Sequence, residues 1–375
     1  MSGTDPLDEL SRAVSDGAAV DWDRAESDEA TVGMQLGVRA LRDLERIAAF
    51  SRSHRRPSER SRAASPGAAQ EGSVSRPLGV GSIAPSIIDA IRDRGTGMSP
   101  KTIVFVHGNF VTRHCWDRWV ERYSARGHRC VAIAYPLRDE SVGALRAKHP
   151  DPALGRLGLR EVVEHHVNVI RSLGEKPVVI GHSFGGFLTQ LLMQRDVAAA
   201  GVAIDSVPVQ GVISLEWSFA RSLFPVFNPL VSRTKPYLMS FPEFQYTFVN
   251  GMPFAAQREA YDREVVPESR VLASGALGAG GRVDFKRDRP PLLMIAGSDD
   301  HIMPASLNRA NFERYKASPA VTSFKEFPGR NHYLIGAPGW EEVADFAVDW
   351  ALAHARDGAS RESAGATEVT APAAP

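Results

Sequence analysis

A short glycine-rich stretch holds the residue best suited to nucleophilic chemistry. Val178 to Ile180 are apolar and β-branched, and Gly181-His182-Ser183-Phe184-Gly185 follows them directly, ahead of an apolar segment with helical spacing. This order predicts a strand, a sharp turn and a helix, with Ser183 at the apex of the turn. The two flanking glycines allow strand and helix to come close together. A serine hydroxyl exposed at such a turn can act as a nucleophile.

Residues downstream could activate this serine, which needs a base to take its proton and an acid to orient the base. His332 lies on a loop between the last predicted strand and the final helix, and we expect it to be the base. The acid is expected on the segment 297–304, which follows another strand. Its spacing favours Asp300 over the neighbouring Asp299, and Glu216 is a weaker alternative.

Backbone N–H groups near the serine could stabilise an oxyanion. Phe184 begins the predicted helix, where its N–H group is free to donate to developing negative charge. A second donor is expected from the turn His107-Gly108-Asn109-Phe110, at the end of the first strong strand. Either Asn109 or Phe110 could supply it, and we favour Asn109.

The other histidines form no metal-binding pattern. His182 is expected to point away from the apex of the turn and to be structural. His165 and His166 are adjacent, but no ligand set of matching spacing follows them, so we expect them on a helix surface. No metal site is predicted.

Strands and helices alternate along most of the chain. Strands are expected within 102–109, 130–136, 178–181, 210–215, 291–297 and 323–328, and helices at 161–173 and 340–354. The strands are nearly continuous apolar runs, as is typical when helices cover both faces of a sheet. This alternation predicts an α/β fold with a doubly wound, mostly parallel sheet.

One region interrupts the alternation and is rich in aromatic residues and prolines. Residues 216–288 contain no clear strand, and short helices with proline-bounded ends fit them best. We expect a helical cap inserted between two strands, which divides the core into 79–215 and 289–357. Trp217 and Phe219 of the cap, together with Phe110, are candidates for the wall of an apolar substrate pocket.

The two ends of the chain differ from the core in composition. Residues 1–78 are expected to be a disordered or linker extension with an amphipathic helix near 31–50. That helix could lie on a membrane surface, but packing on its own domain or on a partner is favoured. Residues 358–375 are rich in Ala, Ser and Pro and are expected to be a disordered tail.

Charge and composition exclude several classes of partner. The 375 residues carry 44 Lys and Arg and 44 Asp and Glu, so no overall field favours nucleic acid. No apolar stretch approaches the length of a membrane span, and the start of the chain lacks the apolar core of a signal peptide. Cys115 and Cys130 are expected to be lone thiols. We expect a cytoplasmic protein with a small-molecule acyl substrate, and the oligomeric state stays open.

Taken together, these motifs resemble those of the α/β-hydrolase superfamily. The similar motifs, in chain order, are His107-Gly-Asn-Phe110, Ile180-Gly-His-Ser-Phe-Gly-Gly186, the Gly297, Asp300 and Pro304 spacing, and Gly329-Arg-Asn-His332. The resemblance covers roughly 100–355 and is to capped serine hydrolases of the AB hydrolase-1, actinobacterial-like type. It implies an α/β-hydrolase fold in which Ser183 is the nucleophile, Asp300 the acid and His332 the base. It also implies oxyanion N–H groups from Asn109 and Phe184, and no cofactor.

The expected activity is that of a serine hydrolase. It would cleave a carboxylic ester, lactone or thioester of a fairly apolar small molecule through an acyl-enzyme. Serine at the apex argues against dehalogenase and epoxide hydrolase chemistry, which use an aspartate nucleophile in this fold. Two alternatives stay open: a cofactor-free perhydrolase (haloperoxidase-like) or C–C hydrolase on the same triad, and a non-catalytic ligand-binding protein of this fold.

Overall fold

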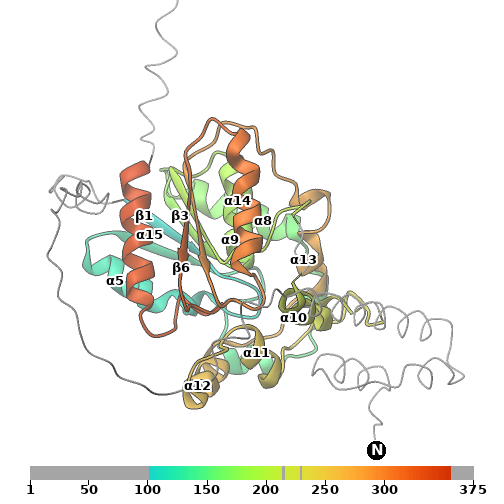
Figure 1. The fold of residues 1–375 in the computed structure, drawn as a ribbon. Coiled ribbons are helices and arrows are strands. Elements are labelled where there is room, and N and C mark those ends of the chain that lie inside the picture. The colour runs from blue at the N-terminus through green and yellow to red at the C-terminus, as the bar shows by residue number, and fades with distance from the viewer. Residues whose placement is uncertain (1–100, 213–215, 229, 356–375) are drawn as a thin grey trace, which may run out of the picture.

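A parallel sheet of six strands forms the centre of the fold (Figure 1). The computed structural model describes residues 101–212, 216–228 and 230–355. Its strands are β1 (Thr102–Val106), β2 (Arg129–Ile133), β3 (Val178–His182), β4 (Ala200–Ile204), β5 (Leu292–Gly297) and β6 (Thr322–Phe327). They lie in the order β2-β1-β3-β4-β5-β6, and every neighbouring pair is parallel. The chain therefore changes direction between β1 and β3, and ligands of such sheets bind outside the carboxyl ends of the strands at this point.

Helices cover both faces of the sheet. They are α5 (Asp117–Ala125) and α15 (Trp340–His354) on one face, and α8 (Leu159–Ser172), α9 (Phe184–Gln194) and α14 (Ala305–Arg314) on the other (Figure 1). Short helices α6 (Val142–Ala147) and α7 (Pro152–Arg156) and the 3-10 turns η2 (Arg113–Trp116) and η4 (Tyr315–Ala317) join them. The buried central strands β1, β3, β4 and β5 thus contact protein on both sides.

The alternation of side chains along β1 divides the core into two clusters. Ile103 and Phe105 pack with Trp119 of α5 and with α15. Val104 and Val106 belong to the cluster on the side of α8 and α9. Successive strand residues point to opposite faces, so an unbroken apolar run serves both layers.

Helices also occupy most of the chain between β4 and β5. They are α10 (Trp217–Phe227), α11 (Phe241–Thr247), α12 (Phe254–Glu264), α13 (Arg270–Gly275) and the 3-10 turn η3 (Ala279–Gly281). Ser240 and Glu243 form a capping box at the start of α11, which explains where that helix begins. Phe244 and Phe248 pack with Met303 and Tyr333, which lie on the loops after β5 and β6. These helices therefore cover the loops at the carboxyl ends of the strands.

The sequence prediction failed at one strand. Residues 210–212 form a turn instead of the expected strand at 210–215, and 213–215 lie outside the described residues. The true strand is β4, whose sequence, Ala-Gly-Val-Ala-Ile, contains alanine and glycine at three of five positions, and both residue types are depleted in strands. A Cβ on Gly201 would lie 2.8 Å from the Sδ of Met193 on α9, so the Met193 side chain would have to shift to accept it. The other predicted strands and both helices are confirmed, with α15 at its predicted bounds.

Several predictions for the chain ends fall outside the described residues. These are the helix near 31–50, the linker up to residue 78 and the tail at 358–375. Both cysteines are free thiols, as expected. Within the described ranges, the helices are too short or too polar to cross a membrane.

Candidate active site

Ser183 sits at the apex of the turn between β3 and α9, as predicted. Its φ of 58° and ψ of −119° are a backbone conformation that residues other than glycine rarely adopt. Neighbouring backbone holds this conformation: the N–H of Ser183 donates to Ile204 O at 2.8 Å, and Ser183 O accepts from Val207 N at 3.1 Å. The turn is therefore fixed by β4 and the segment after it.

The glycines that flank the serine allow close approach of backbone. A Cβ on Gly181 would lie 2.1 Å from Gly185 O, and a Cβ on Gly185 would lie 2.1 Å from Val106 O. Any side chain at either position would force α9 away from β1 and β3. Helix α9 can begin directly after Ser183 only because both positions are glycine.

His332 and Asp300 meet in a fully buried hydrogen bond. The Nδ1–H of His332 donates to Asp300 Oδ2 at 2.6 Å, and neither side chain is exposed to solvent. Asp300 Oδ1 accepts the N–H groups of Ile302 and Met303, both at 2.8 Å, so the carboxylate is held by its own loop. With its proton on Nδ1, neutral His332 presents an unprotonated Nε2, which is buried and has no hydrogen-bond partner in the described part of the chain. The imidazole is thus arranged as a proton acceptor.

The other candidate acids lie elsewhere. Asp299 is exposed and accepts a hydrogen bond from Ser298 Oγ at 2.7 Å. Glu216 is also exposed, and it accepts a hydrogen bond from Ser306 on α14. The structure therefore brings Asp300 to His332, in preference to Asp299 or Glu216.

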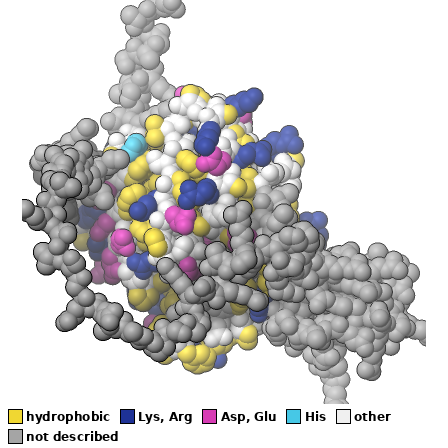
Figure 2. All heavy atoms as spheres, viewed as in Figure 1, with side chains coloured by type: hydrophobic (Ala, Val, Ile, Leu, Met, Phe, Trp, Pro, Cys, Tyr) yellow, Lys and Arg dark blue, Asp and Glu magenta, His cyan; other side chains and the backbone are white. Residues whose placement is uncertain are grey.

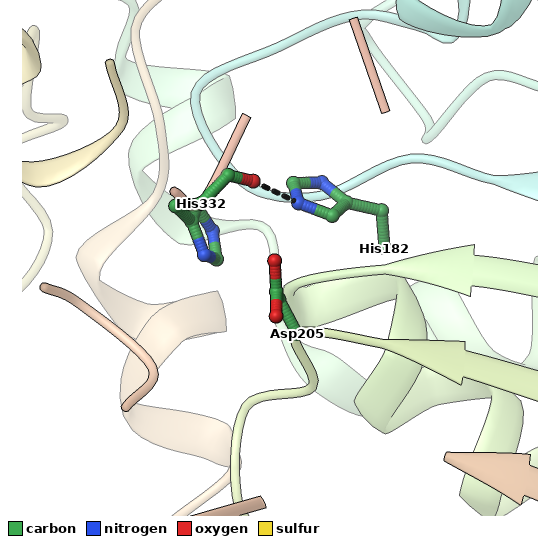
Figure 3. Close-up of side chains that lie close together, drawn as sticks. All are labelled: His182, Asp205 and His332. Carbon is green, nitrogen blue, oxygen red and sulfur yellow. Dashed lines mark hydrogen bonds between the residues drawn. The ribbon is translucent and has the colours of Figure 1, made fainter. Parts of the chain in front are cut away.

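His182, the residue before the serine, supports the backbone of His332. Its Nε2–H donates to His332 O at 2.7 Å, and its ring lies 4.7 Å from the His332 ring (Figure 3). Burial, and secondly the nearby His332, hold the pKa of His182 well below its usual range. A neutral, buried histidine in this place is structural, in line with the sequence prediction.

The predicted oxyanion donors lie on two turns that meet at Ser183. Phe184 is the first residue of α9, so its N–H has no acceptor within the helix. In the turn after β1, a Cβ on Gly108 would lie 2.9 Å from the Cβ of Ser183. The N–H of Phe110 donates to Glu268 Oε2 at 3.3 Å, which leaves the N–H of Asn109 as the candidate donor of this turn.

A buried ion pair fixes that turn, and nothing in the sequence indicated it. Arg138 Nη1 and Glu268 Oε2 are 2.7 Å apart, with both side chains almost fully buried. Arg138 Nη2 also donates to Val111 O at 2.8 Å. Glu268 lies between α12 and α13, so this contact ties the helices that follow β4 to the turn after β1. The partners are 130 positions apart, and no local pattern could pair them.

Another buried carboxylate was missed because β4 was missed. Asp205 follows β4 directly and is fully buried. One ligand atom each of Asp205, His182 and His332 lies within 4.8 Å of the others (Figure 3). These are the described residues that come closest to a cation site. His182 Nε2 and His332 Nδ1 are already engaged, by His332 O and Asp300, whereas His182 Nδ1 and His332 Nε2 have no hydrogen-bond partner among the described residues.

The histidine pair on α8 is only partly as predicted. His166 is fully buried, so the expectation of a helix surface is wrong for this residue. Its Nδ1–H donates to Val162 O at 2.7 Å, and burial lowers its pKa to about 4. Val162, Val163 and Val167 lie on the same buried face of α8.

A cavity of about 600 Å³ lies among the helices that follow β4. Residues of its wall include Arg221, Tyr237, Met239, Glu243, Tyr246 and Arg270. Its lining includes neither Ser183 nor His332, and none of the predicted pocket residues Phe110, Trp217 and Phe219. Phe110 contacts the wall indirectly, because its ring packs edge-to-face on Tyr237 at 5.8 Å. The substrate-binding role of these three residues stays a prediction.

The chain is similar in sequence to curated esterases of rice. The chain is 34% identical over 139 residues to the probable esterase PIR7A of rice, Oryza sativa, and 32% identical over 122 residues to the rice esterase PIR7B. The PIR7A match covers 34% of this chain and 48% of the rice protein, and the PIR7B match covers 30% and 41%. The chain therefore spans about half the length of the curated relatives it matches.

Solved structures share the fold at lower identity. The monoacylglycerol lipase of Paleococcus ferrophilus is 20% identical, with a TM-score of 0.50 over 68% of this chain and 96% of the lipase. An extracellular alpha/beta-hydrolase from a Paenibacillus species is 20% identical, with a TM-score of 0.51 over 69% of this chain and all of that protein. Residues 103–346, from β1 into α15, match the sequence profile of one family. With the parallel sheet and the serine turn in place, the chain belongs to the alpha/beta hydrolase family.

Proposed function

We propose that the protein is a serine hydrolase that cleaves a carboxylic ester, lactone or thioester of a fairly apolar small molecule. The observation that carries this proposal is the buried His332, whose Nδ1–H is bonded to Asp300 and whose Nε2 has no partner in the part of the chain described. The matched rice proteins are named as esterases, which supports ester hydrolysis. The apolar side chains of the cluster around Phe244 and Phe248 support an apolar substrate.

In the proposed reaction, the residues around Ser183 act in sequence. His332 Nε2 takes the hydroxyl proton while Ser183 Oγ attacks the acyl carbon. The N–H groups of Asn109 and Phe184 stabilise the oxyanion, and Asp300 stabilises the imidazolium. The intermediate collapses, its bond to the leaving group breaks, and His332 returns the proton to the leaving oxygen or sulfur. Water then attacks the acyl-enzyme while His332 takes a proton from it. The bond between the acyl carbon and Ser183 Oγ breaks, and His332 returns the proton to Ser183.

The remaining proposals concern the organisation and setting of the protein. We propose that 216–288 are a cap on a core made of 79–215 and 289–357, because α10 to α13 pack on the loops after β5 and β6. We also propose a cytoplasmic location and no nucleic-acid partner. On the face drawn in Figure 2, Lys and Arg are interspersed with Asp and Glu and do not gather into one basic patch.

An active-site label followed by a substrate panel tests this function. We expect a fluorophosphonate probe to label the wild type, and the wild type to hydrolyse p-nitrophenyl esters. Ser183→Ala should abolish labelling and lower kcat/KM by at least about 10³-fold. Equal labelling of the wild type and Ser183→Ala would refute the nucleophile. Tight binding of acyl compounds without turnover would instead favour a non-catalytic protein of this fold, and turnover only in peroxide-dependent halogenation or β-diketone cleavage would favour the other triad chemistries.

A further inference from the structure

A second carboxylate lies beside His332 and has no place in the reaction so far. Asp205 follows β4 and is fully buried, with a φ of 42° in the left-handed region. Its Oδ1 accepts the N–H of Gly297 at 2.8 Å, and this contact joins the ends of β4 and β5. Its Oδ2 is buried without a hydrogen-bond partner among residues 101–212, 216–228 and 230–355. Figure 3 shows this carboxyl group pointing between His182 and His332.

The titratable groups that face Asp205 come from three elements. His182 ends β3, Asp300 lies on the loop after β5, and His332 lies on the loop after β6. An Asp205 oxygen is within 4.8 Å of a nitrogen of His332. A hydrogen bond needs a separation of about 3 Å, so the two atoms would have to approach each other by less than about 2 Å.

The two carboxyl groups differ in the donors that reach them. Asp300 accepts three hydrogen bonds, from Ile302, Met303 and His332. Asp205 accepts only that of Gly297 among the bonds described. Burial, and secondly the negative charge of Asp300, raise the pKa of Asp205 well above its ordinary value of 3.8. Two adjacent buried carboxyl groups do not both ionise readily, and the raised pKa of Asp205 favours its protonated form.

We propose that Asp205 is a positioning residue held in reserve: a neutral carboxylic acid that ionises and orients His332 when the Asp300 carboxylate is removed. The inference rests on the proposed hydrolase function. Without the charge of Asp300, Asp205 releases its proton to solvent and its carboxylate accepts the ring N–H of His332. The imidazole then keeps a partner that fixes its tautomer and stabilises its protonated form.

The test compares Asp300→Asn, Asp205→Asn and the double variant for hydrolysis of p-nitrophenyl acetate between pH 5 and pH 9. Loss of the orienting aspartate in a serine protease triad lowers kcat by about 10⁴-fold. We expect Asp300→Asn to lower kcat/KM by only about 10²-fold, and the double variant by the full ~10⁴-fold. Asp205→Asn alone should lower kcat/KM by less than about fivefold, because its neutral side chain is replaced by another neutral acceptor. In Asp300→Asn, kcat/KM should rise with pH as Asp205 ionises.

Controls separate this inference from the function on which it rests. Asp299→Asn removes the exposed neighbouring acid and should leave kcat/KM unchanged. A low-field proton NMR signal of the His332 ring N–H should persist in Asp300→Asn and disappear in the double variant. Equal kcat/KM and equal NMR spectra for Asp300→Asn and the double variant, with both folded by circular dichroism, would overturn the reserve role. Absence of wild-type turnover, or full turnover by Ser183→Ala, would instead overturn the hydrolase proposal.

Discussion

At the scale of single residues, His332 is held by contacts to both its ring and its backbone. Asp300 holds the ring through Nδ1, and His182 holds the carbonyl group through a 2.7 Å hydrogen bond. All three residues are buried. We therefore predict that the orientation of the imidazole, and with it the position of Nε2, depends on both hydrogen bonds.

Replacing His182 should test the backbone contact. His182→Phe removes the donor to His332 O and leaves that carbonyl buried without it. We expect the free energy of unfolding to fall by about 1–3 kcal/mol and kcat to fall by about tenfold with little change in KM. His182→Gln, which retains an N–H donor, should recover part of both losses. Urea denaturation and steady-state kinetics measure these effects, and a kcat equal to wild type in His182→Phe would contradict the positioning role.

The protonation of Asp205 predicts a pH dependence of stability. The pKa of Asp205 in the folded protein lies above its ordinary value of 3.8. The contribution of Asp205 to the free energy of unfolding is therefore greatest below pH 3.8, and it is lost as the pH rises through the folded-state pKa. Asp205→Asn removes this decline. We expect the difference between the Tm of the variant and the Tm of the wild type to increase as the pH rises from about 4. Thermal unfolding in a series of buffers measures this difference. A relative Tm that fell over this range would show that Asp205 is charged in the folded protein.

At the scale of elements, the turn after β1 is held from the far side by the helices that follow β4. Glu268 accepts from both Arg138 and the backbone N–H of Phe110. The second bond engages the N–H of Phe110, and no such bond to the N–H of Asn109 is found among the described residues. We therefore predict that Glu268, which lies between α12 and α13, determines which amide of the turn is available to an oxyanion.

Breaking this pair should reduce the stability of the protein. Glu268→Gln leaves the Arg138 guanidinium buried without its counter-charge, and we expect the free energy of unfolding to fall by about 3–5 kcal/mol. Glu140→Gln, which disrupts the exposed pair with Lys148, is the matched control. It should change the free energy of unfolding by at most about 1 kcal/mol. Chemical denaturation of both variants gives the comparison. Similar losses in the two variants would show that burial adds nothing to the Glu268 pair.

The same elements show what sequence patterns could and could not predict. Strands β1, β3 and β5 were predicted because their burial on both faces requires unbroken apolar runs. Strand β4 was not predicted, since Ala200, Gly201 and Ala203 are residue types with low strand preference. Asp300 could be favoured from its spacing, whereas Asp205 could not be recognised once its strand was missed. Arg138 and Glu268 become neighbours only through the tertiary fold.

At the scale of the whole molecule, all residues of the candidate site lie within 101–355. The turn after β1, the serine turn, and the loops after β5 and β6 converge at the carboxyl edge of one sheet. The alpha/beta hydrolase profile covers the same part, residues 103–346. We therefore predict that the proposed chemistry needs no residue from the first 78 positions.

Deleting residues 1–78 tests this independence. We expect the shortened chain to hydrolyse p-nitrophenyl esters with a kcat/KM within about threefold of the full chain, because every proposed site residue is retained. Circular dichroism and thermal unfolding establish that the shortened chain is folded. Loss of turnover in a folded truncated protein would mean that the predicted helix near 31–50 contributes to the active site.

The dependence of Ser183 on β4 has a consequence for the order in which the protein folds. The backbone strain at the serine is sustained by Ile204 and Val207, so β3 and α9 alone cannot hold it. The nucleophile should therefore form only after β4 has docked between β3 and β5. During refolding, fluorophosphonate reactivity is expected to return no earlier than protection of the β4 amides from hydrogen exchange. Stopped-flow labelling combined with pulsed hydrogen exchange measures both events. Recovery of reactivity before protection of the β4 amides would contradict this order.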